Sequence, residues 1–140
     1  MTLKRDLEIL DDPEGDLDWD ECWESLMSHD DYSDQAVGLL LDKLNGRTEI
    51  VRMGVIRKLS HSPISFERWS LKLPPLLADE NRLVRVEALD AVASHASELT
   101  PELVVSLRSM LGRPNEHLDL RLRAWILLRQ LRRSMASRSL

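Results

Sequence analysis

The sequence predicts an all-α protein built from stacked helical hairpins. One pattern, an aliphatic residue followed by arginine and further small or aliphatic residues, recurs at 51–55, 84–88 and 120–124, with starts 33 and 36 residues apart. A period of this length is typical of two-helix units that bury their apolar faces against their neighbours. The composition agrees, because 43% of the residues are hydrophobic and only 11 of 140 are glycine or proline.

An acidic N-terminal segment with one helix is predicted for residues 1–34. Apolar residues at helical spacing in 3–10 indicate a short helix or a flexible lead-in, which stops at the turn 11–15. The helix of this segment is expected to begin at a cap supplied by Asp16 or Asp18 and to run to about Met27. Acidic residues in its first turn have a favourable interaction with the helix dipole.

A repeat domain is predicted for residues 35–133. Thr48 and Thr100 are expected to cap helices, and Pro101 suits a first helical position. Pro74 and Pro75 must interrupt their segment, since neither donates an amide hydrogen and their rings crowd the preceding turn. Residues 134–140 are expected to form a frayed tail. The expected helical segments are 35–44, 49–59, 66–78, 81–96, 101–111 and 116–133.

No pattern in the sequence indicates catalysis or a bound cofactor. The four histidines have no second ligand at metal-binding spacing, and His95 is expected to be a partly buried, hydrogen-bonded side chain. Cys22 has only acidic neighbours, which would raise its pKa. The acids at 16, 18 and 20 lack the glycine and distal glutamate of a calcium loop. We therefore expect a non-enzyme without metal or cofactor.

The single cysteine and the lack of any long apolar run favour a cytoplasmic protein that does not enter a membrane. The charge is distributed unevenly. Residues 1–35 carry thirteen acids and two bases, a formal charge of −11, whereas the rest of the chain carries +6. A molecule with two oppositely charged ends is steered in its choice of partner, and its acidic end favours a basic one.

The acidic segment also contains the candidate partner-binding residues. Trp19 and Trp23 lie one helical turn apart among carboxylates, and tryptophan is enriched where interfaces concentrate their binding energy. The alternative is that both rings cover Leu40 and Leu44 and serve the core. The acids assigned to the partner-binding surface are Asp16, Asp18, Asp20, Glu21, Glu24, Asp30 and Asp31.

The alternation of a helix, a tight turn and a second helix with an aliphatic-Arg-x-x-Ala pattern resembles the HEAT repeat family, in particular the short bacterial repeats of the phycobilisome lyase type. The resemblance covers about residues 35–133. Asp79 matches the family's acid before the second helix, whereas Val55 stands at the alanine position of the first repeat. The resemblance implies a short α-solenoid of about three hairpins after the acidic segment.

Two interpretations are open for the repeated arginines. In the HEAT family they tend to pair with acids of the neighbouring turn, which implies a structural ladder. Alternatively they form a basic edge that follows a phosphate backbone, to which Arg57, Lys58, Arg129, Arg132 and Arg133 would add further charge. The residues of this basic edge are Arg52, Arg85, Arg121 and Arg123.

Stacked hairpins offer an extended surface with few converging polar groups, which suits binding better than catalysis. We expect a protein–protein interaction module, most concretely an immunity-type inhibitor: an acidic bacterial protein that masks a basic toxin or effector. One alternative is a nucleic-acid-binding protein that uses the basic edge. Another is a scaffold or lyase-type subunit of a hetero-complex.

Overall fold

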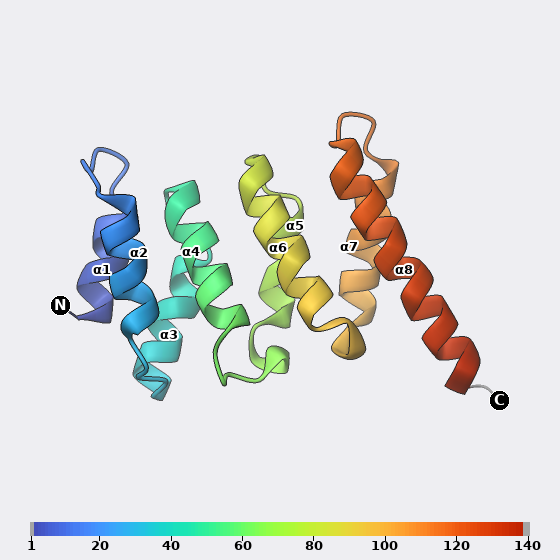
Figure 1. Cartoon of the computed structure of the whole chain (residues 1–140), viewed down its shortest axis with the longest axis horizontal. Coiled ribbons are helices and arrows are strands. Elements are labelled where there is room, and N and C mark those ends of the chain that lie inside the picture. The colour runs from blue at the N-terminus through green and yellow to red at the C-terminus, as the bar shows by residue number, and fades with distance from the viewer. Residues whose placement is uncertain (1, 139–140) are drawn as a thin grey trace. The chain divides into compact units, whose positions relative to one another are not determined.

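The computed structural model describes the backbone of residues 2–138 and the side chains of residues 2–135. Within these limits the protein is all-helical and has no strand, which agrees with the predicted all-α class (Figure 1). Its elements are the α-helices α1 (Leu3–Leu10), α2 (Trp19–Ser28), α3 (Asp34–Lys43), α4 (Glu49–Ser60), α5 (Leu73–Leu77), α6 (Arg82–Ser94), α7 (Pro101–Gly112) and α8 (Leu118–Arg138), with the short 3-10 turns η1 (Phe66–Arg68), η2 (Ser70–Lys72) and η3 (Ala96–Glu98).

The chain divides into two compact units, Met1–Ser65 and Phe66–Leu140, which we call the N-terminal and C-terminal units. This division falls after Ser65, not after residue 34 as the sequence predicted. The reason is that α1 packs against α3 and α4, and α2 packs against α4, so the acidic segment shares a core with the first hairpin. Besides the expected helix α2, the segment contains α1, which resolves the choice between a short helix and a flexible lead-in for residues 3–10.

Side-chain caps begin the helices of the N-terminal unit. Thr2, Asp18, Ser33 and Thr48 each accept a hydrogen bond from a backbone N–H of the following turn. The structure thus resolves the choice between Asp16 and Asp18 in favour of Asp18, whose carboxylate accepts from the N–H of Glu21 at 3.3 Å. Local sequence therefore decides where these helices start.

The N-terminal core is formed by aliphatic side chains from all four helices. The fully buried residues include Leu7, Leu10, Leu26, Leu40 and Val55. Each contributes roughly 1.5–3 kcal/mol relative to an exposed position. Within this unit α1 packs against α2 and α3 packs against α4, and the two helix pairs contact each other (Figure 1).

Gly46, in the turn between α3 and α4, is required by close approach. A Cβ atom there would lie 2.2 Å from Cγ1 of Val51 and 3.0 Å from Oδ1 of Asp11. No residue from 2 to 138 has a positive φ, so the left-handed cap that glycine often supplies is not the reason for this residue. Glycine is needed instead because the turn packs closely against Asp11, at the end of α1, and against Val51 of α4.

Asp11 ties the end of α1 to that same turn. Its buried carboxylate accepts hydrogen bonds from Nζ of Lys43 at 2.7 Å and from the backbone N–H of Arg47 at 2.6 Å. Burial raises the pKa of Asp11, but these hydrogen bonds outweigh burial and the pKa lies below its ordinary value. The acidic segment is therefore anchored to the first hairpin through a specific ion pair.

In the C-terminal unit the two prolines break their helix as expected. Residues 66–78 form η1, η2 and only then the five-residue helix α5, in which Pro74 and Pro75 occupy early positions. Amide hydrogens in the first turn have no intrahelical acceptor, so proline is tolerated there. The segment wraps Phe66 and Trp69 into the core, where both side chains are buried.

The remaining helices of the C-terminal unit pack in succession, α5 on α6 and α7 on α8. Thr100 caps α7 and Pro101 stands in its first turn, as the sequence predicted. His95 is half-buried: Nδ1 lies 2.9 Å from the carbonyl oxygen of Ala91 and its ring stacks on Phe66 with centroids 4.4 Å apart. The prediction of a partly buried, hydrogen-bonded histidine is confirmed.

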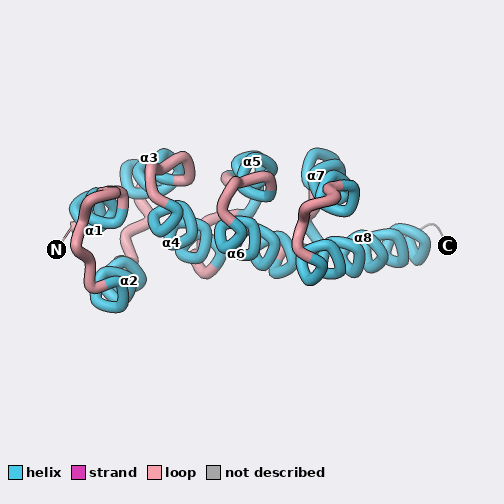
Figure 2. Tube along the Cα trace, turned by 90° about the horizontal axis from the view of Figure 1, so that it is seen from above, coloured by secondary structure: helices cyan, strands magenta, loops and turns pink. Residues whose placement is uncertain are grey.

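The last helix is longer than expected. α8 continues to Arg138, so the part of the predicted frayed tail from residue 134 to 138 is helical, while residues 139–140 lie outside the described chain. Residues 134–138 contain no glycine or proline that would end a helix. Figure 2 shows α8 continuing past the end of α7, its neighbour in this unit.

Candidate functional site

A surface on α2 combines aromatic and acidic side chains. Trp19 and Trp23 are half-buried and stack on each other with ring centroids 5.7 Å apart and planes inclined by 23°. The acids around them all have exposed side chains, so their charges face solvent. We call this set the acidic tryptophan surface; it consists of Trp19, Trp23, Asp16, Asp18, Asp20, Glu21 and Glu24.

Trp23 is the inner ring of the pair. A Cβ atom at Gly54 of α4 would lie 3.3 Å from Cζ3 of Trp23, so the ring packs directly on the glycine. The guanidinium of Arg57 lies over the same ring, 4.9 Å from its centroid. Leu40 and Leu44, which the rings were alternatively expected to cover, are buried. Trp23 thus has a packing role on α4, and Trp19 stacks on it.

Asp30 and Asp31 follow α2 and are also exposed. The carboxylate of Asp31 accepts a hydrogen bond from the backbone N–H of Ser33 at 3.0 Å, and this bond lowers the pKa of Asp31. Asp30 and Asp31, two members of the predicted partner-binding set, therefore lie in the loop that leads to α3, beyond the end of α2.

A polar network lies inside the N-terminal unit. The carboxylate oxygen Oδ2 of Asp6, a fully buried residue of α1, accepts a hydrogen bond from Oγ of Ser25 at 2.9 Å and lies 2.6 Å from Nε2 of His29. Nζ of the buried Lys58 donates to the carbonyl oxygen of His29 at 2.6 Å. Ser25 and His29 therefore share one oxygen of a buried carboxylate, and Lys58 is tied to the same loop through the backbone of His29.

The sequence reasoning missed this network, although a signal was present. Asp6 occupies the apolar face of α1 together with Leu3, Leu7 and Leu10, and Lys58 occupies that of α4 beside Val55 and Leu59. Charged residues on an apolar stripe indicate buried, paired groups. Burial lowers the pKa of Lys58. The negative charge of Asp30 raises it, but burial has the larger effect. The expectation that Lys58 adds to a surface basic edge is therefore wrong.

Cys22 lies on α2 and is half-buried. Burial raises the pKa of its thiol, and the negative charges of Asp6, Asp18 and Glu21 raise it further. This agrees with the prediction from its acidic neighbours. A thiol that is held protonated is a poor nucleophile.

Arg52 and Arg85, two members of the predicted basic edge, make the same contact. In each, Nη1 donates to the carbonyl oxygen six residues earlier, at 2.9 Å: Gly46 for Arg52 and Asp79 for Arg85. Each arginine thus ties the turn before its helix to the helix itself. Both arginines therefore have a structural role in holding the start of their helices.

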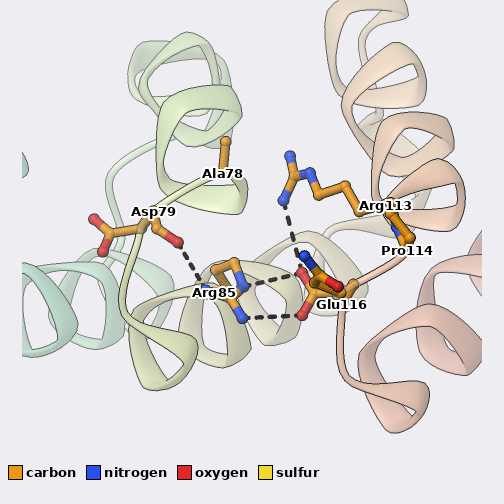
Figure 3. A pocket seen from close by; sticks show the side chains of 7 residues that line it. Ala78, Asp79, Arg85, Arg113, Pro114 and Glu116 are labelled. Carbon is orange, nitrogen blue, oxygen red and sulfur yellow. Dashed lines mark hydrogen bonds and ion pairs between the residues drawn. The ribbon is translucent and has the colours of Figure 1, made fainter.

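Arg85 also forms an ion pair within the C-terminal unit. Its Nη2 and Nε atoms lie 3.0 Å and 2.9 Å from the two carboxylate oxygens of Glu116, which is buried. Nη1 of Arg113 lies 3.6 Å from the same carboxylate and donates to the carbonyl oxygen of Leu77 at 3.1 Å. A pocket of about 410 Å³ opens above this clamp, and Figure 3 shows both guanidinium groups directed at Glu116. The carboxylate offsets part of the positive charge, so the pocket is not a strong anion site.

The other members of the basic edge lie on α8. Nη1 of Arg123 lies 2.9 Å from Oδ1 of Asp90, and its Nε lies 3.2 Å from Oδ2 of Asp119. Arg121 is half-buried. Among the described side chains, no group of three or more His, Cys, Asp or Glu residues is arranged to hold a metal ion.

None of the helices described for residues 2–138 combines the length and apolar character that a bilayer-spanning segment requires. Comparison of the chain with protein-family models, with curated proteins and with solved structures gave no significant match.

Proposed function

We propose that this protein is a non-enzymatic interaction module that binds a basic partner protein through the acidic tryptophan surface of α2. The observation that carries the proposal is the stacked pair of Trp19 and Trp23, which is half-buried and flanked in the sequence by exposed acidic residues. Aromatic anchors supply contact area at low entropic cost, and surrounding charge steers association.

The geometry around the pair supports a preformed binding surface. Trp23 rests on Gly54 and beneath Arg57, so the ring that carries the stack is held before any partner arrives. Side chains that are ordered in the free protein lose less conformational entropy on binding. Gly54 and Arg57 both contact Trp23, so Trp19 is the residue to which we assign direct partner contact.

The most concrete form of this proposal is an immunity-type inhibitor that masks a basic toxin or effector in the bacterial cytoplasm. The formal charge of −11 on residues 1–35 supports it, because acidic inhibitors associate quickly with cationic targets. We assign the repeats to a HEAT-like α-solenoid. The shared contact of Arg52 and Arg85 supports equivalent positions in successive repeats.

Nucleic-acid binding by the basic edge receives less support. The side chains of Arg52, Arg85 and Arg123 are each engaged with a carbonyl or a carboxylate of the protein. Phosphate binding would have to displace these partners, and the chain as a whole carries a charge of −5. No contact specifically favours a scaffold or lyase-type subunit over a simple binding module.

The experiment uses three versions of the full chain as bait in native lysate, with captured proteins identified by mass spectrometry. The first is the wild type, the second carries Trp19→Ala, Asp20→Asn and Glu24→Gln, and the third is the matched control Asp42→Asn, which removes an exposed acid from α3. A basic protein retained by the wild type and by Asp42→Asn, but lost from the triple variant, supports the proposal.

Circular dichroism must show equal helicity for the three baits. If the triple variant folds and still captures the same proteins as the wild type, binding through this surface is ruled out. If the protein is an immunity-type inhibitor, the captured protein should be toxic when expressed by itself. Co-expression of the wild type, but not of the triple variant, should then restore growth.

A further inference from the structure

The face of α8 opposite its buried side exposes large apolar residues. The exposed fractions are 76% for Leu118, 52% for Leu122, 46% for Trp125 and 41% for Ile126. These positions follow helical spacing and point away from Leu120, Ala124 and Leu127, which are buried. Contiguous apolar side chains on a surface indicate an interaction site more often than chance exposure does.

The helix α8 as a whole is strongly basic. α8 contains six arginines and one acid, a formal charge of +5. Arg129 lies on the same side as Trp125, with its guanidinium 5.2 Å from the ring centroid. Arg132 and Arg133 follow in the next turn, and both are exposed. An occupant of this face must therefore be both apolar and acidic.

The charge of α8 argues against its pairing with α8 of a second copy, because two helices of charge +5 would repel one another. The chain itself presents a helix with the required chemistry. On α2, Trp19, Trp23 and Met27 recur every four residues, and the helix carries Asp20, Glu21 and Glu24 without any base. Met27 is exposed and both tryptophans are half-buried.

We propose that α8 of one copy of this chain docks onto the acidic tryptophan surface of a second copy. Apolar side chains meet at the centre of the contact and arginines face carboxylates at its rim. The two surfaces differ, so the association is head-to-tail. This inference rests on the proposed function, because it names a second copy of the chain as a ligand of the same α2 surface.

Sedimentation velocity on the full chain tests the proposal with two variants that each disable one surface. Leu122→Glu adds a charge to the α8 face, and the pair Asp20→Lys with Glu24→Lys reverses charge on α2; all three positions are exposed. The wild type should show a mass that rises with concentration and falls between about 50 mM and about 500 mM NaCl. Each variant should remain a monomer when studied by itself.

The decisive sample is an equal mixture of the two variants. The Leu122→Glu chain retains an intact α2 and the lysine variant retains an intact α8, so the mixture should form a dimer of one chain of each kind. Val105→Glu, an exposed apolar position on α7, is the matched control and should associate like the wild type. A monomeric wild type, or a mixture that remains monomeric, overturns the proposal.

Vesicles of phosphatidylcholine and phosphatidylserine provide the contrasting arm. Sedimentation of a monomeric wild-type chain with these vesicles, lost only in Leu122→Glu, would assign the α8 face to an anionic membrane and overturn docking between copies. Failure here is distinguishable from failure of the proposed function. Leu122→Glu leaves the α2 surface intact and removes the competing α8 face, so this variant should still capture a basic partner from lysate whether or not wild-type copies associate.

Discussion

Arg85 and Glu116 lie 31 positions apart in the sequence, yet they meet through two nitrogen–oxygen contacts of 3.0 Å and 2.9 Å. The pair joins the first half of α6 to the loop before α8. The buried carboxylate of Glu116 also contacts Arg113, so one acid binds two arginines (Figure 3). The clamp thus links two hairpins of the C-terminal unit.

Glu116→Gln should lower the free energy of unfolding by about 3 kcal/mol, because removing one partner of a buried ion pair leaves the other charge uncompensated. Urea denaturation followed by circular dichroism measures the change. The slope of the transition should stay the same, since the surface exposed on unfolding does not change.

Arg123→Ala is the matched comparison for an exposed ion pair. Arg123 contacts Asp90 at 2.9 Å, but both side chains are about half-exposed, so its loss should cost no more than about 1 kcal/mol. Equal destabilisation by the two substitutions would contradict the structural role assigned to Glu116.

Two helical glycines should respond differently to alanine. Gly38 in α3 has no atom within 4 Å of the added Cβ, so Gly38→Ala should stabilise the protein by about 0.5–1 kcal/mol through helix propensity. At Gly54 the same Cβ would lie 3.3 Å from Trp23 and 3.4 Å from Leu26. At Gly54 the close contact should cancel the stability gained from helix propensity. Tryptophan fluorescence should change, because the ring of Trp23 must shift.

Thermal unfolding of both variants measures this difference. An equal gain at the two positions would show that Trp23 moves without cost, which would remove the argument that Gly54 seats the tryptophan stack. The comparison is well matched, because both residues lie inside helices and neither has a positive φ.

Asp11→Asn should destabilise the protein by about 1–3 kcal/mol at neutral pH, since it loses the ion pair with Lys43. The pKa of Asp11 is lower in the folded chain than its ordinary value. Its stabilising contribution is therefore fully present above a pH of about 4, the value for an unfolded aspartate, and is lost as the pH falls through the lower folded pKa.

Urea titrations at a series of pH values check this dependence. The gap between wild type and Asp11→Asn should narrow as the solution becomes acidic, whereas the exposed control Asp42→Asn should show a small difference throughout. A gap that is independent of pH would mean that the carboxylate charge of Asp11 does not contribute.

Cys22 should react with a thiol reagent more slowly in the folded chain than in the chain unfolded by guanidinium. Burial and the nearby charge of Asp6 raise the pKa of the thiol, so less thiolate is present at neutral pH. Reaction with Ellman's reagent over a range of pH measures this. A fast reaction at pH 7 that does not accelerate on unfolding would contradict the raised pKa.

Much of the secondary structure could be predicted from local sequence. Thr48 and Thr100 cap the helices that they were expected to cap, and Pro74 and Pro75 interrupt their segment as expected. Caps and prolines act within one helical turn, so a single sequence contains the information. The end of α8 was wrongly predicted because polar composition was interpreted as fraying, although no helix-breaking residue is present.

The candidate site could be predicted only in part. The spacing of Trp19 and Trp23 indicated that they share a helix face, and their stack agrees with that. Which side of the pair faces the protein could not be predicted, because it depends on Gly54 and Arg57 of another helix.

By itself, the sequence determined the all-helical class, the positions of most helices and the concentration of negative charge in residues 1–35. Only the tertiary structure decided that Asp6 and Lys58 are buried, that Arg85 binds Glu116, and that the acidic segment shares a core with the first hairpin. The physical reason is range: helix formation and capping depend on neighbours within a turn, whereas burial and ion pairing depend on residues brought together from distant parts of the chain.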